Sequence, residues 1–167
     1  MVDRDGHVQL RGVDRDEADD HDGLYLQIVI VVIFNKHGDL LVHERSARKA
    51  VNPGDVDHVC GGVLSGETPE AAAVRETREE TGVAVHNLRL AKPGINSYNR
   101  YRWLFVGSAN EQPSLTEPDE INWVAWRSLE SLVQARDSGE LTYVNEFFEE
   151  VALAEEALRR HPGKDAL

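Results

Sequence analysis

Five glutamates and two arginines lie within residues 66–83, and their spacing could support chemistry. Glu76, Glu79 and Glu80 are three and four residues apart, so a helix would place them on one face. Like charges at these spacings oppose helix stability by roughly 0.2–0.5 kcal/mol per pair. A hard divalent cation would explain why the three carboxylates share one face, because magnesium takes carboxylate oxygens and completes its shell with water and substrate phosphate oxygens. The spacing therefore favours a metal site over a merely solvated helix face.

The helix that would carry these glutamates is marked at both ends. Thr68 can cap its N-terminus, Pro69 suits the first helical position, and Gly82 suits the left-handed residue that ends a helix. Arg75 can pair with Glu79 one turn later, but one arginine cannot neutralise three carboxylates. We therefore expect a helix from Thr68 to Thr81 that concentrates negative charge.

The rest of the chain predicts a sheet around this helix. Residues 24–34 are β-branched and apolar on both faces, which is typical of a strand buried on two sides. Strands are expected at residues 24–34, 40–45, 58–63, 83–90, 102–106 and 121–126, and two further helices at 127–139 and 145–160. Strands on either side of one helix, followed by two more helices, indicate an α/β domain whose mixed sheet is covered on both faces.

Composition narrows the class of protein. The 167 residues are 41% apolar and 29% charged, which suits one globular domain, and the formal net charge is -12. Such a charge disfavours a nucleic acid duplex or a membrane surface as partner. The single cysteine, Cys60, allows no internal disulfide, and neither a signal peptide nor a membrane span is visible. These features predict a soluble, cytoplasmic protein.

A basic segment offers a second kind of site. Arg45, Arg48 and Lys49 gather in an otherwise acidic chain. They could clamp the phosphates of a small anionic substrate, or they could be ordinary surface charge. The two interpretations are equally open from the sequence.

The glutamate pattern resembles the signature of the Nudix hydrolases. That signature runs glycine, five spacers, glutamate, seven spacers, Arg-Glu, an aliphatic residue, any residue, Glu-Glu, any residue, glycine and an aliphatic residue. Its seven fixed residues stand in register at Gly61, Glu67, Arg75, Glu76, Glu79, Glu80 and Gly82. Thr77 departs from the pattern, which prefers an aliphatic residue there.

The resemblance implies a fold and a reaction. The fold would be a Nudix-type α/β/α sandwich with a mixed β-sheet, formed as a single domain over residues 1–167. Residues 61–83 would be the Nudix box, and residues 1–23 an N-terminal extension that we expect to be ordered. The reaction would be hydrolysis of the pyrophosphate bond in a nucleoside diphosphate derivative, or in a similar diphosphate joined to another group X. The expected partner is thus a small-molecule diphosphate, and a homodimer is left open.

The resemblance also implies roles for single residues. Glu76, Glu79 and Glu80 would bind Mg²⁺, for which Mn²⁺ could substitute, and Gly61 would add a backbone carbonyl. Arg75 and Glu67 would contact these ligands and orient them without binding the metal themselves.

Members of the family differ in the carboxylate that removes the proton from the attacking water. We predict Glu79 as the base, with Glu76 or an acid in a later loop as alternatives. Glu120, just ahead of the strand predicted at 121–126, is the later-loop candidate.

Two functions other than hydrolysis are also considered, an isomerase and a non-catalytic sensor. The stretch around Cys60 also resembles isopentenyl diphosphate isomerases, a branch of the same superfold in which a cysteine is essential. The segments at residues 2–6, 23–26, 34–46 and 52–54 are laid out much as in that branch. Those isomerases bind metal through histidines, and the corresponding positions are Gly62 and about Leu26 here. The match is therefore closer to the hydrolases within that branch. A non-catalytic sensor of a nucleotide derivative is the other alternative, which the complete glutamate set disfavours.

Overall fold

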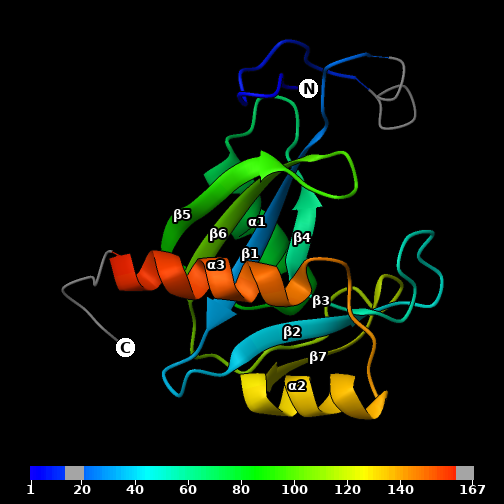
Figure 1. The fold of residues 1–167 in the computed structure, drawn as a ribbon, viewed down its shortest axis with the longest axis vertical. Coiled ribbons are helices and arrows are strands. Elements are labelled where there is room, and N and C mark those ends of the chain that lie inside the picture. Colours follow the sequence, from blue (N-terminus) through cyan, green and yellow to red (C-terminus); the bar gives the residue numbers. More distant parts are fainter. Residues whose placement is uncertain (14–20, 161–167) are drawn as a thin grey trace.

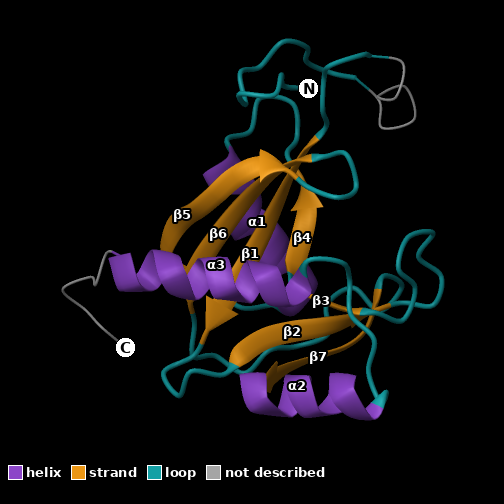
Figure 2. Ribbon diagram, viewed as in Figure 1, coloured by secondary structure: helices purple, strands orange, loops and turns teal. Residues whose placement is uncertain are grey.

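The computed structural model describes residues 1–13 and 21–160, which form a sheet with helices on both sides (Figures 1 and 2). The elements are β1 (Gln27–Phe34), β2 (Leu40–Arg45), β3 (Val56–Asp57), β4 (Val59–Gly62), α1 (Pro69–Thr81), β5 (His86–Ile95), β6 (Tyr101–Ser108), β7 (Ile121–Arg127), α2 (Leu129–Ser138) and α3 (Phe147–Arg160). Every predicted strand and helix is present, with bounds shifted by five residues at most. The two-residue strand β3 was not predicted, because it is too short to show a periodic pattern.

The sheet is mixed and centred on β1. Strand β1 runs parallel to β6 and antiparallel to β2 and β4, while β5 lies outside β6 and β7 pairs with β2. The register of β1 with β2 contains one pair, Phe34 with Leu40. The sheet therefore separates into a part around β1 and a part around β2, which Figure 1 shows above and below α3.

Both faces of β1 are buried, as its composition predicted. Ile30 and Val32 belong to a core cluster that includes residues of α2 and α3. Val29 and Val31 belong to a second cluster that contains Ala72 of α1. Because side chains alternate between the faces of a strand, one strand supplies both cores. The predicted α/β/α sandwich with a mixed sheet is confirmed (Figure 2).

Helix α1 begins and ends where its caps predicted. The Thr68 side chain accepts a hydrogen bond from the Ala71 N–H at 3.2 Å, and Gly82 adopts a left-handed φ of 69°. Thr77, the departure from the family pattern, is fully buried and donates its hydroxyl to the Ala73 carbonyl at 2.7 Å. The hydroxyl is thus satisfied inside the helix, and the position remains part of the buried face.

The N-terminal segment folds back against the start of the sheet. The N-terminal ammonium of Met1 donates to the Leu10 carbonyl at 2.6 Å, and Val2 bridges to Val8 and Tyr25. Part of the extension predicted to be ordered, residues 14–20, lies outside the described residues. Within the described ranges, no helix combines the length and apolar character needed to cross a membrane.

Candidate metal centre and adjoining cavity

Glu76 and Gly61 are brought together by the packing of α1 on β4. A Cβ atom added to Gly61 would lie 1.9 Å from the carboxyl carbon of Glu76. Such an approach is possible only for glycine, so the sequence pairing of these two positions has a steric reason. Strand β4 is itself fixed by β1, where Gly61 pairs with Val29.

Arg75 binds three glutamates of the box, Glu67, Glu76 and Glu79. Its Nε and Nη2 donate to the two carboxylate oxygens of Glu67 at 3.0 and 2.9 Å. Its Nη1 donates to Glu76 at 2.7 Å and to Glu79 at 2.9 Å, and its Nη2 also reaches the Gly62 carbonyl at 2.9 Å. The guanidinium lowers the pKa of Glu67 through these hydrogen bonds. Arg75 and Glu67 therefore lie where they could orient Glu76 and Glu79.

Glu80 has a different environment, although it belongs to the same helix. It is 8% exposed, and its carboxylate accepts a hydrogen bond from the Cys60 N–H at 3.2 Å. No lysine or arginine of the described residues pairs with it. The nearby His43 Nδ1, at 3.7 Å, belongs to a ring whose pKa burial lowers to about 3. Burial, followed by the charges of Asp57 and Glu76, raises the pKa of Glu80 well above its usual value.

The loop before β7 contains two acids, Glu117 and Glu120, of which Glu117 lies near the glutamates of α1. Glu117 is close enough to Glu76 and Glu80 to raise the pKa of both. Glu120, the predicted later-loop candidate, is exposed and forms an ion pair with Lys49. Sequence reasoning did not single out Glu117, because two acids three residues apart in one loop give no signal for which one faces the helix.

The predicted basic clamp is divided among three acidic partners. Arg45 donates to Asp57 at 3.0 Å, and Arg48 donates to Asp119 at 2.7 Å. Lys49 pairs with the Glu120 mentioned above. Arg45 is half-buried, whereas Arg48 is well exposed, so the three cations do not form one cluster of free charge.

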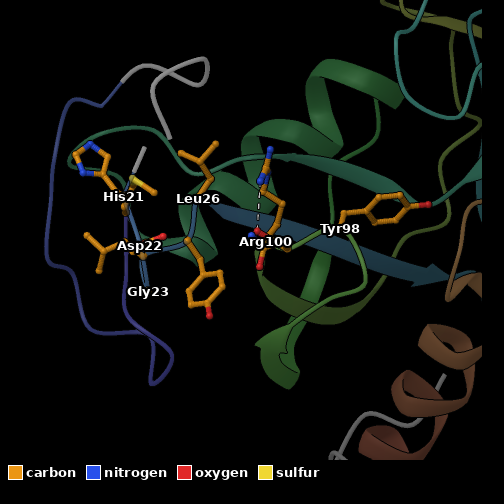
Figure 3. Close-up of a pocket in the computed structure, with 10 residues that line it drawn as sticks. His21, Asp22, Gly23, Leu26, Tyr98 and Arg100 are labelled. Carbon is orange, nitrogen blue, oxygen red and sulfur yellow. Dashed lines mark hydrogen bonds between the residues drawn. The ribbon is translucent and has the colours of Figure 1, made fainter. Parts of the chain in front are cut away.

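A cavity of about 220 Å³ is lined in part by Cys60, and we call it the Cys60 cavity. The Cys60 side chain lines it, together with side chains from β1, the loop before β6 and the start of α3. A wider depression of about 560 Å³ lies between His21–Leu26 and the turn before β6 (Figure 3). Tyr98 and Arg100 line both hollows, so this turn forms a wall between them.

The Cys60 cavity contains two buried acids. Asp57 on β3 is 5% exposed, and burial raises its pKa to about 6 against the opposing effect of Arg45. Glu150 on α3 is 1% exposed, and burial raises its pKa to about 8 against the opposing effect of Arg102. Burial also raises the pKa of the Cys60 thiol well above its ordinary value.

Sequence reasoning did not find Glu150, although a signal was present. The buried residues of α3 are Phe147, Glu150, Val151 and Ala154, which follow the three- and four-residue spacing of an apolar helix face. A glutamate within such a stripe is unusual, because ionised side chains are rarely buried unless they are paired. Its partner Arg102 is 48 residues away in the chain.

The donor set fits a hard divalent cation. Glu76 and Glu80 supply carboxylate oxygens in a place where Glu80 is buried without a positive partner among the described residues. Oxygen ligands of this kind suit Mg²⁺, and an unpaired buried carboxylate is costly without a cation. In this structure Arg75 draws Glu76 and Glu79 together, whereas Glu80 turns to the Cys60 N–H. The three carboxylates therefore do not converge on one point.

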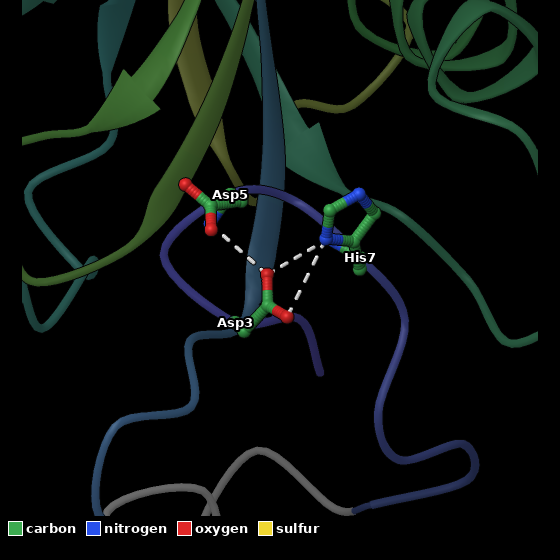
Figure 4. Close-up of side chains that lie close together, drawn as sticks. All are labelled: Asp3, Asp5 and His7. Carbon is green, nitrogen blue, oxygen red and sulfur yellow. Dashed lines mark hydrogen bonds and ion pairs between the residues drawn. The ribbon is translucent and has the colours of Figure 1, made fainter.

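One group of possible ligand atoms within 4.8 Å of one another is found in the described residues, and it lies elsewhere. It consists of Asp3, Asp5 and His7 in the N-terminal segment (Figure 4). The Asp3 carboxylate accepts hydrogen bonds from the backbone N–H groups of Asp5 and His7 and from the Gln9 side chain. These bonds shape the loop, and they account for the proximity without an ion.

Curated relatives include both isomerases and hydrolases. The chain is 35% identical over 112 residues to an isopentenyl-diphosphate Delta-isomerase of Citrobacter koseri, and the match spans 62% of each chain. It is 31% identical over 148 residues to the isomerase of Streptomyces coelicolor, with 80% of this chain and 72% of that one covered. An uncharacterized Nudix hydrolase of Listeria innocua is 30% identical over 133 residues, which cover 73% and 76% of the two chains.

Solved structures share the fold. The crystal structure of DR0079 from Deinococcus radiodurans aligns with a TM-score of 0.68 at 24% identity, over 95% of this chain and 96% of that one. A hydrolase of the NUDIX family from Clostridium perfringens aligns with a TM-score of 0.62 at 19% identity, over 82% and 98%. At these identities the likeness establishes the architecture and leaves the substrate open.

The family itself is established by its sequence model. The model of the NUDIX domain matches residues 24–147, most of the chain. This range includes the helix with its glutamates and extends to the start of α3. The match supports a hydrolase that acts on phosphorus-containing anhydrides, and members of the family generally use divalent metal ions. The chain belongs to the Nudix family.

Proposed function

We propose that this protein hydrolyses the pyrophosphate bond of a nucleoside diphosphate derivative, or of a similar diphosphate joined to a group X, with Mg²⁺ as its cation. The observation that carries the proposal is Glu80, a buried carboxylate without a positive partner in the described residues, next to Glu76. A divalent cation between this helix and the substrate phosphates would supply the missing positive charge.

The proposed ligands are Glu76, Glu79, Glu80 and the carbonyl of Gly61. When bound, the cation would neutralise phosphate charge and lower the pKa of the attacking water. The steric fit of Glu76 against Gly61 supports their shared role. Mn²⁺ has the same preference for oxygen ligands and is the proposed substitute.

A protein carboxylate would remove the proton from the water. Glu79 is the proposed base, because its side chain is half exposed and Arg75 holds it in place. Glu120 remains the later-loop candidate predicted from the sequence. Glu117 joins it as a second one, because its charge acts on Glu76 and Glu80 and it is itself within reach of the charge of Glu79.

Arg45, Arg48 and Lys49 are the proposed phosphate-binding residues. Arg45 is the best placed of the three, because it lines the Cys60 cavity. The other two are paired with acids of the loop before β7, so phosphate would compete with those carboxylates. We also propose that residues 1–167 form one domain, which the bridge from Val2 to Tyr25 supports.

An isomerase using Cys60 is the second candidate, because several relatives carry that name and the Cys60 side chain lines the cavity. Two features disfavour it. Gly62 and about Leu26 stand where those isomerases have metal-binding histidines. In addition, burial raises the pKa of the Cys60 thiol, which lowers the fraction of reactive thiolate.

Two variants separate the candidates. Glu80→Gln and Cys60→Ala would be assayed for Mg²⁺-dependent release of monophosphate or phosphate from a library of diphosphates, and for isomerisation of isopentenyl diphosphate. We expect Glu80→Gln to abolish hydrolysis and Cys60→Ala to retain it. Loss of hydrolysis with Cys60→Ala alone would refute the proposed mechanism. Absence of turnover by the wild type on every diphosphate would favour a sensor.

A further inference from the structure

His43 is a polar residue on an apolar face of β2. Leu41, two residues earlier on the same face, belongs to the core cluster that contains residues of α1, and Val124, which pairs with His43 from β7, packs against that cluster. Because alternate residues of a strand point to the same side, the His43 ring also points toward α1. The residue is 2% exposed. A polar ring at such a position requires a specific partner.

The Nδ1 atom of this ring has one acidic neighbour, Glu80. Nδ1 is buried and has no hydrogen bond to any residue in the described ranges, and Glu80 Oε2 on α1 lies 3.7 Å from it. This separation exceeds the usual N–H···O distance by about 0.7 Å, which a small rotation of either side chain would close. Since Nδ1 is buried, its partner must come from the protein itself, and an unpaired buried nitrogen would be unfavourable.

The charge states of the two groups decide the direction of this hydrogen bond. Burial lowers the pKa of His43 to about 3, so the imidazole is neutral and carries one N–H and one bare nitrogen. A carboxylate that binds a cation is ionised and can only accept hydrogen bonds. Beside Glu80 in its metal-binding form, the proton of the His43 ring therefore belongs on Nδ1.

Two N–H groups from different strands then meet at one oxygen of Glu80. The Cys60 N–H of β4 donates to Oε2 at 3.2 Å, and His43 approaches the same oxygen from β2. Oε1 has no hydrogen bond to the described residues and is not one of the buried unpaired atoms, so it keeps access to solvent. Both groups at Oε2 are neutral, so neither repels a cation as an arginine or lysine would.

We propose that His43 is a positioning residue of the metal centre: its Nδ1–H donates to Glu80 Oε2 and, together with the Cys60 N–H, leaves Oε1 to bind the cation. The inference rests on the cation binding of the proposed function and adds to it a residue outside the glutamate helix. Because the two donors lie on β2 and β4, they fix the Glu80 carboxylate relative to the sheet as well as to α1.

The wild type tests the hydrogen bond without any substitution. Nitrogen NMR of protein isotope-labelled at its histidine rings, and saturated with Mg²⁺, distinguishes a ring nitrogen that carries a proton from a bare one. We expect the proton of His43 on Nδ1. A bare Nδ1 in the Mg²⁺-bound protein would overturn the inference, and this measurement stands even if a variant of His43 does not fold.

Substitutions measure the contribution of the hydrogen bond to metal affinity. The Mn²⁺ dissociation constant, obtained from the EPR signal of the free ion, is compared in the wild type, His43→Leu and His43→Asn. His43→Leu fills the space without a donor and should weaken Mn²⁺ binding by about 10–100-fold, as for the loss of a group that supports a metal ligand. His43→Asn keeps a nitrogen donor bonded to Cγ, as Nδ1 is, and should stay closer to the wild type. Equal affinities of the wild type and His43→Leu would overturn the inference.

His58→Leu is the matched control. His58 is also fully buried, and its Nδ1 likewise has no partner within residues 1–13 and 21–160, but its ring stacks on Phe147. Its replacement should leave the Mn²⁺ affinity unchanged, whatever its effect on Tm. Equal losses of affinity in the two leucine variants would overturn the inference. Absence of Mg²⁺ and Mn²⁺ binding by the wild type would overturn both proposals, whereas the expected affinities without hydrolysis of any diphosphate would support the inference and overturn the proposed function alone.

Discussion

Glu80 and Glu150 are both buried carboxylates on helices, yet their surroundings are opposite. Glu80 lies on α1 beside other acids, and no arginine or lysine of the described chain neutralises it. Glu150 lies on α3 and is bound by Arg102 through one of its two oxygens. Cys60 stands between them, since its N–H contacts Glu80 and its side chain lines the cavity of Glu150.

The contrast separates two uses of a buried acid. A carboxylate without a positive partner is costly to bury, so its retention is best explained by a cation that binds there. A carboxylate that an arginine already holds has its charge compensated, so its burial requires no bound cation. The first arrangement suits metal binding, and the second suits a structural ion pair.

Replacing Glu80 should give the largest effect on activity and little loss of stability. We expect Glu80→Gln to lower kcat/KM at least about 10³-fold, because loss of a residue that only supports a metal ligand already costs about 10–100-fold. The amide oxygen can still accept the Cys60 N–H, and a buried charge is removed. Measured thermal unfolding should therefore show an equal or higher Tm. A marked drop in Tm with little loss of activity would mean that Glu80 is structural.

Replacing Arg102, the partner of Glu150, should instead lower the stability of the protein. Arg102→Met leaves Glu150 buried and unpaired, which costs about 3 kcal/mol and lowers Tm by roughly 6–12 °C for a chain of this length. The double variant Arg102→Met/Glu150→Met should recover most of the loss, since apolar replacement of a buried ion pair is often neutral. Urea unfolding of both variants measures this. Equal stability of the single and double variants would show that the pair is not coupled.

Gly61 tests how closely Glu76 must approach β4. We expect Gly61→Ala to lower kcat/KM by roughly 10–100-fold, as for a disturbed metal ligand, because the added methyl would overlap the Glu76 carboxyl group. The neighbouring Gly62→Ala is the control, since a Cβ there meets no atom within 4 Å. The assay is Mg²⁺-dependent hydrolysis with both variants. Equal activity of the two would argue against the predicted role of Gly61.

Local signals explain what could be predicted from the sequence. The caps Thr68 and Gly82 define α1 without help from the rest of the fold, and helical spacing alone places Glu76 and Glu80 on one side. The same spacing cannot show that Glu80 is buried and Glu79 exposed, because that depends on where β4 lies. The environment of each glutamate therefore required the structure.

Long-range contacts explain what was missed. Glu150 is paired with Arg102 from β6, and the cavity beside it combines residues of β1, β3, β4 and α3. No short motif contains these residues, so the sequence pattern that predicted the metal centre gave no indication of the cavity. The buried stripe of α3 was the available sign, since Glu150 occupies an apolar position of that helix.

A further effect should be a change in the pH dependence of stability that belongs to Glu150 alone. Burial and the nearby acids Asp57 and Glu146 raise its pKa to about 8, although Arg102 opposes the shift, whereas the unfolded chain has the ordinary value of 4.5. Between these two pH values the folded state keeps a proton that the unfolded state releases, so stability falls as pH rises through this window. The contribution is fully present below pH 4.5.

Glu150→Gln removes this ionisation and keeps the shape of the side chain. The free energy of unfolding, measured in urea at intervals from pH 5 to 8, should therefore decline more steeply in the wild type than in Glu150→Gln. All other titrating groups are shared by the two proteins, so the difference between the curves isolates Glu150. A constant difference would mean that Arg102 keeps Glu150 ionised throughout.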